Sequence, residues 1–118
     1  MKTRLIPLSV IVVLAVASSA MAGSKLGDLT SFEVIASDTK TLIEKGDLKA
    51  AARRITDFET AWDKAQATLY PKDKTAWSRI DDAADAAIAS LRAKRPDAAS
   101  SEQTVSTLID TLKDTAAQ

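Results

Sequence analysis

Residues 47–69 read DLKAAARRITDFETAWDKAQATL, and the spacing of their apolar side chains decides the fold class. Successive apolar positions step by four, three, four, three and four residues, which places them on one face of an α-helix. These inward positions are Ala51, Ile55, Phe58, Trp62, Ala65 and Leu69. We predict a helix that Asp47 caps at its start and that ends at Tyr70 and Pro71, because proline cannot continue a helix.

A preceding helix is predicted over residues 30–45. The Thr-x-x-Glu sequence that begins at Thr30 is a capping box, with Leu29 and Val34 at the flanking positions of a hydrophobic staple. Gly46 ends this helix, since glycine readily adopts the left-handed conformation that follows a last helical turn. The apolar positions are Phe32, Ile35, Leu42 and Ile43, with Thr39 interrupting the stripe.

Two more helices complete the chain. One is predicted over residues 72–94, ending before Pro96, and the other over residues 98–115. The latter begins at Asp97 or at Ser100, since either side chain can cap it. The inward positions are Trp77, Ile80, Ala84, Ala87, Ile88 and Leu91 in the former and Val105, Leu108, Ile109 and Leu112 in the latter.

Short connections make neighbouring helices antiparallel, so we predict an all-α, up-down-up-down four-helix bundle. A shift of 50 residues lays Ile55 on Val105 and Trp62 on Leu112, which indicates a duplicated αα-hairpin. An open, tetratricopeptide-like stack is the alternative, because the turn at Gly46 is common in such repeats. Those repeats recur at about 34 residues, however, and this period is not found in the chain.

The first 22 residues have the pattern of a secretory signal peptide. Lys2 and Arg4 precede an apolar run, and small residues end at Ala22, after which we predict cleavage. An uncleaved anchor is the alternative, although the run is shorter than the roughly 20 residues of a spanning helix. We expect a signal peptide at 1–22, a flexible segment at 23–29, and one helical-bundle domain at 30–118. The predicted location is the periplasm, without membrane attachment after cleavage.

The charges argue against nucleic acid as a partner. The chain has 16 basic and 16 acidic residues, and loss of the signal peptide removes Lys2 and Arg4 but no acidic residue. The remaining charges of both signs alternate along the chain, whereas nucleic-acid binding requires clustered positive charge. The chain also has no cysteine, so its core must be stable without disulfides.

Several chemistries are excluded by composition. The chain has no histidine or cysteine, and its two methionines, Met1 and Met21, lie in the predicted signal peptide. Haem, zinc and copper sites therefore lack their usual ligands, and no activated nucleophile is evident. Carboxylates four residues apart, such as Asp81 and Asp85, leave weak binding of a hard cation as an alternative. We predict a non-enzymatic protein without a cofactor or an assigned metal site.

Trp62 and Trp77 are the candidate functional residues, together with Phe58 and Tyr70. A hairpin that turns near residue 71 brings both indoles to the same end of the bundle, where they can touch. Two interpretations follow. The four rings either fill the core as an aromatic plug or line a small apolar pocket or a partner-binding groove.

The segments SDTKTLIEKGDLKAA at 37–51 and DFETAWD at 57–63 resemble short exported α-helical proteins of unknown function from Gram-negative bacteria. The resemblance continues through Trp77 to Pro96, and it implies an envelope protein with no catalytic residues to carry over. We expect the protein to bind another envelope protein or a signalling partner. The alternatives are a carrier of a small apolar ligand at the Trp62 and Trp77 end and the weak cation binder.

Overall fold

The structure, a computed structural model, describes residues 25–116, so the predicted signal peptide lies outside the described residues. Within that range the chain forms helices α1 (Thr30–Glu44), α2 (Leu48–Leu69), α3 (Lys74–Leu91) and α4 (Ala98–Ala116), and no strand. None of these helices combines the length and hydropathy required to cross a membrane.

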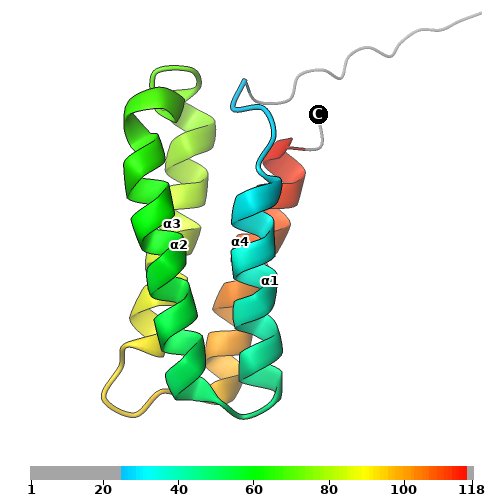
Figure 1. The fold of residues 1–118 in the computed structure, drawn as a ribbon, viewed down its shortest axis with the longest axis vertical. Coiled ribbons are helices and arrows are strands. Elements are labelled where there is room, and N and C mark those ends of the chain that lie inside the picture. The colour runs from blue at the N-terminus through cyan, green and yellow to red at the C-terminus, as the bar shows by residue number, and fades with distance from the viewer. Residues whose placement is uncertain (1–24, 117–118) are drawn as a thin grey trace, which may run out of the picture.

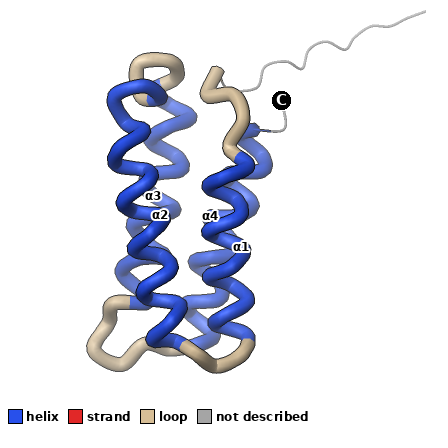
Figure 2. The backbone as a smooth tube through the Cα atoms, viewed as in Figure 1, coloured by secondary structure: helices blue, strands red, loops and turns tan. Residues whose placement is uncertain are grey.

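The helices alternate in direction and are joined by short turns (Figures 1 and 2). Helix α1 packs against α2 and α4, and α3 also packs against α2 and α4, so the four helices enclose a single core. The contact between α1 and α4 closes the bundle, whereas an open stack would keep the first and last helices apart. The predicted up-down-up-down four-helix bundle is therefore confirmed.

Helix α2 follows its predicted pattern. The side chain of Asp47 accepts a hydrogen bond from the backbone N–H of Ala50 at 3.1 Å, which caps the helix. Of the six predicted inward positions, five are buried and Ala65 is half-buried. The predicted inward residues of α3 and α4 are all buried as well. Spacing alone thus identified the face of each of these helices that forms the core.

The predicted capping box at the start of α1 is wrong. Leu29 is the N-cap residue, and both the N–H and the hydroxyl of Thr30 donate to the Asp28 carboxylate, at 2.9 and 2.6 Å. The N–H of Glu33 donates to the Leu29 carbonyl instead of the Thr30 hydroxyl. Asp28 can form this local turn because aspartate readily hydrogen-bonds the backbone two residues onward. Val34 is 51% exposed, so it does not pack on the buried Leu29 as a staple would require.

The residues before α1 belong to the core, in contrast to the flexible segment expected at 23–29. Leu26 and Leu29 are both buried, and between them Gly27 has a φ of +80°. This left-handed conformation is easily accessible only to glycine, and it turns the chain between the two leucines. The backbone N–H of Lys25 also donates to the Asp73 carboxylate at 3.4 Å. The described part of the segment therefore covers one end of the bundle.

Helix α3 is shorter than the predicted range of 72–94. Asp73 caps it by accepting from the N–H of Ala76 at 3.0 Å, so the helix begins at Lys74. It ends at Leu91, and the following Arg92 binds the Glu59 carboxylate of α2 at 2.6 Å. Charge near the end of a helix does not by itself extend the helical pattern, which depends on buried apolar positions.

Helix α1 buries a polar residue that the sequence pattern treats as an interruption. Thr39 is fully buried, and its hydroxyl donates to the Ile35 carbonyl one turn earlier at 2.9 Å. This bond satisfies the hydroxyl inside the core. Ala36, which lay outside the predicted stripe, is buried too, whereas Phe32 and Leu42 are only half-buried.

The start of α4 supports a matched pair of substitutions. The Asp97 carboxylate accepts from the N–H of Ser100 at 2.9 Å, which selects Asp97 over Ser100 as the cap. We expect Asp97→Ala to lower the free energy of unfolding by about 1 kcal/mol. Ser100→Ala should change it by less than about 0.5 kcal/mol, because Ser100 is an exposed side chain without a capping role. Urea denaturation of both variants measures the difference, and equal effects would contradict this cap assignment.

Candidate functional site

Aromatic rings form a continuous cluster through the bundle. Trp62 of α2 and Trp77 of α3 stack with their ring centroids 5.4 Å apart and their planes 12° apart. Phe58 stacks on Trp62 with the ring centroids 5.9 Å apart, and Tyr70 meets Trp77 edge-on at 5.4 Å. The prediction that the two indoles lie near the same end of the bundle is confirmed, and the structure brings all four candidate residues together.

Helix α1 adds a fifth ring, that of Phe32. The sequence pattern placed Phe32 on the inward face of this helix but did not include it in the candidate site. Phe32 contacts Trp62 edge-on at 5.1 Å and Phe58 at 5.8 Å. Edge-on and offset contacts of this kind are the favourable arrangements of aromatic rings. The sequence showed that Phe32 faces inward, but only the packing of α1 on α2 places it at the same height as Trp62.

Burial favours the core interpretation of the cluster. Trp62 is 1% exposed, and Phe58 and Trp77 are also buried, whereas Tyr70 at the end of the hairpin is 36% exposed. Three surface hollows of the described residues are lined by other side chains. One is bordered by Arg79 and Asp110, a second by Gly27 and Glu33, and a third by Asp38 and Arg54. The tryptophans thus fill the space between α2 and α3, as expected of a plug.

One hydrogen bond connects the aromatic core to the surface. The indole N–H of the buried Trp62 donates to the Asp81 carboxylate of α3 at 3.2 Å. Asp81 is half-buried, so this carboxylate lies between the core and solvent. The indole N–H of Trp77, in contrast, is buried without an acceptor, which is an unfavourable state for a polar group.

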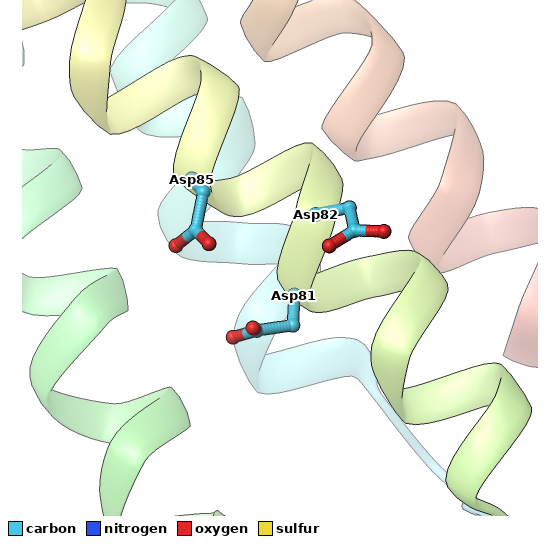
Figure 3. A group of neighbouring side chains, drawn as sticks. All are labelled: Asp81, Asp82 and Asp85. Atoms are coloured by element: carbon cyan, nitrogen blue, oxygen red, sulfur yellow. The ribbon is translucent and has the colours of Figure 1, made fainter.

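Asp81 belongs to a group of three carboxylates on α3, together with Asp82 and Asp85 (Figure 3). One carboxylate oxygen from each of the three residues lies within 4.8 Å of the other two. In Figure 3, Asp81 projects toward α2 and Asp82 toward α4. Burial raises the pKa of Asp81, and the negative charges of Asp85, Asp82 and Asp63 raise it further. The hydrogen bond from Trp62 opposes this increase in the pKa by stabilising the ionised form.

The acidic group takes no part in the ion pairs that connect the helices of the described chain. Arg54 pairs with Asp38 at 2.9 Å, Arg92 with Glu59 at 2.6 Å, and Arg79 with Asp114 at 3.3 Å, which connects successive helices. In residues 25–116 no such ion pair includes the three carboxylates of the group or Asp63. Repulsion among these four carboxylates is therefore not offset by a direct ion pair.

The same geometry does not build a cation site. Calcium requires six to eight oxygen ligands from a loop or from converging elements. The three carboxylates come from neighbouring positions of one helix, and within the described residues no histidine, cysteine, aspartate or glutamate of another helix joins the group. Two of the three side chains are exposed. We therefore assign no metal to the group, which has the features of a solvated acidic surface.

Comparison of the chain with protein-family models, with characterised proteins and with solved structures gives no match. The resemblance to exported helical proteins of Gram-negative bacteria therefore stays a prediction. The inferences about function that follow rest on the geometry of the bundle and its surface.

Proposed function

We propose that this protein is a non-enzymatic, periplasmic four-helix bundle that binds another envelope protein or a signalling partner. The contact surface lies on α2 and α3, and the observation that carries the proposal is an acidic patch whose carboxylates form no ion pair. This patch consists of Asp63, Asp81, Asp82 and Asp85. A basic surface on a partner would offset the repulsion among these carboxylates, and complementary charge of this kind speeds association and selects partners.

The interior of the bundle supports binding through the surface. Its large side chains contact one another, and Phe58, Trp62 and Trp77 are buried in the cluster. The absence of histidine and cysteine from the chain further favours a binding function over catalysis. A carrier of small apolar ligands would need an accessible apolar surface, and of the four candidate rings only Tyr70 is exposed.

The test is affinity capture from periplasm, followed by crosslinking and mass spectrometry. The acidic patch is reversed by the double substitution Asp82→Lys with Asp85→Lys, which changes exposed positions on α3. The matched control is Glu44→Lys with Asp110→Lys, which makes the same charge change at exposed positions on α1 and α4. We expect the wild type and the control to capture the same basic protein, crosslinked to α2 or α3, and the patch variant to lose it.

Three results would contradict the proposal. These are capture that survives reversal of the patch, crosslinks confined to α1 and α4, and turnover of a substrate by the purified protein. Added salt provides a further check, because a contact between exposed charges weakens as ionic strength rises. Saturable quenching of tryptophan fluorescence by an apolar ligand would instead support the carrier function.

A further inference from the structure

The contact between α2 and α3 differs from the other helix contacts in the side chains that form it. Of the four adjacent helix pairs, α2 and α3 have the fewest close approaches between their backbones. Trp62 and Trp77 stack between them, and large side chains at an interface hold two helices apart. The stability of this α2–α3 contact therefore depends strongly on how the two indoles pack.

A titratable group lies directly on this contact. Asp81 accepts the hydrogen bond from Trp62 across the two helices, so the indole and the carboxylate hold each other in position. Asp82 and Asp85 lie beside it on α3, and Asp63 faces it from α2. All of these neighbours carry negative charge when ionised, and each makes ionisation of Asp81 less favourable.

Several other charged side chains near this contact interact with residues elsewhere in the bundle. Glu59 of α2 binds Arg92, and Lys74 of α3 lies 5.7 Å from the centre of the Tyr70 ring. On the side of α4, Asp110, Lys113 and Asp114 line a hollow together with Arg79, which pairs with Asp114. No lysine or arginine of the described chain forms an ion pair with Asp81.

We infer that Asp81, which is hydrogen-bonded to Trp62 across the two helices, makes the α2–α3 contact respond to acid. Protonation of Asp81 removes the cost of holding a charge in a half-buried position, together with its repulsion with Asp85, Asp82 and Asp63, and so favours close packing of α2 on α3. Ionisation restores this repulsion and loosens the contact. The inference concerns the stability of the bundle itself, and it does not depend on the identity of any partner.

The direction of the pH effect follows from linkage. The pKa of Asp81 is raised in the folded protein, so the folded state binds this proton more tightly than the unfolded state does. The stabilisation from Asp81 is therefore present at low pH and is lost as the pH rises through the folded-state pKa. Most carboxylates that form ion pairs behave in the opposite way, because their folded-state pKa is lowered.

Asp81→Asn is the decisive variant, since asparagine keeps an oxygen that can accept from Trp62 but cannot be ionised. We expect this variant to unfold at a higher urea concentration than the wild type at about pH 7, where an ordinary aspartate is ionised. The difference between their unfolding midpoints should shrink as the pH is lowered toward about 4. A variant that is less stable than the wild type at neutral pH, or a difference that does not change with pH, would overturn the inference.

Tryptophan fluorescence reports the same event directly, because Trp62 and Trp77 are the only tryptophans of the chain. The wild-type signal should change at a pH above the ordinary pKa of an aspartate, while far-ultraviolet circular dichroism shows that the helices persist. Asp81→Asn should abolish this change. Asp110→Asn, a matched substitution at an exposed position of α4, should retain it.

Asp85→Asn gives a second route that leaves Asp81 and its hydrogen bond in place. Removing the neighbouring charge lowers the pKa of Asp81, so the fluorescence change should move to lower pH. This variant keeps the inference testable if Asp81→Asn fails to fold. A fluorescence change that stays at the same pH in Asp85→Asn would overturn the assignment to Asp81.

Discussion

Replacing Trp62 with alanine should lower the free energy of unfolding by about 3–5 kcal/mol, the usual cost of removing a large buried aromatic side chain. Trp62 is 1% exposed and contacts the rings of Phe32, Phe58 and Trp77. The substitution removes all three contacts and also the hydrogen bond to Asp81. Urea denaturation followed by circular dichroism measures the loss through the shift of the unfolding midpoint.

A loss of this size approaches the total stability of a small domain, which is about 5–15 kcal/mol. Trp62→Phe is therefore the second variant, because it keeps an aromatic ring in the core and should cost less than the alanine change. Tyr70→Ala is the control within the same cluster, since Tyr70 is 36% exposed and should cost clearly less than Trp62. A nearly unchanged stability of Trp62→Ala would show instead that Trp62 lies on an accessible surface.

Leu29→Ala should lower the free energy of unfolding by about 2–5 kcal/mol, as expected for a buried leucine. Leu29 is fully buried although it precedes α1, and with Leu26 it covers one end of the core. The variant therefore measures how much the chain before the first helix contributes to the bundle. Urea denaturation again gives the change in unfolding free energy.

Val34→Ala is the matched control for Leu29. Val34 lies on α1 and is 51% exposed, so the substitution should change the free energy of unfolding by less than about 0.5 kcal/mol. If Leu29→Ala were equally neutral, residues 25–29 would not contribute to the core, and the expectation of a flexible segment would hold.

Residues that the 50-residue shift aligns between the two hairpins are buried in both. Ile55 and Val105 are both fully buried, and Trp62 and Leu112 are buried at equivalent positions of α2 and α4. Periodicity predicts such positions well because the side chains of a helix repeat every 3.6 residues. A gene duplication that produced the two hairpins stays a prediction, since the helical period by itself generates part of this match.

The starts of α1 and α2 show why a capping motif in the sequence predicts some helix caps correctly and others not. Asp47 was predicted correctly as a cap, because its carboxylate has no competing partner in the turn after Gly46. At the first helix, Asp28 lies two residues before Thr30 and binds its N–H and its hydroxyl. When two side chains can satisfy the same backbone group, the motif alone does not decide between them.

The candidate site was predictable in part. That Trp62 and Trp77 lie near the same end of the bundle follows from the length of each side of the hairpin, and the structure shows that they stack there. The hydrogen bond from Trp62 to Asp81 was not predicted, because it depends on the rotation of each helix about its own axis. Asp81 was recognised only as one of several carboxylates on an exposed helix face.

The amino-acid sequence alone determined that the described chain is helical, where its helices break, and which face of α2, α3 and α4 is buried. These properties depend on residue spacing and on backbone preferences within a few positions. Only the tertiary structure decided that Leu26 and Leu29 close the core, that Phe32 joins the aromatic cluster, and that Asp81 binds Trp62. Such contacts join residues on different segments, and their distances depend on how the segments pack, which the order of residues along a single helix does not specify.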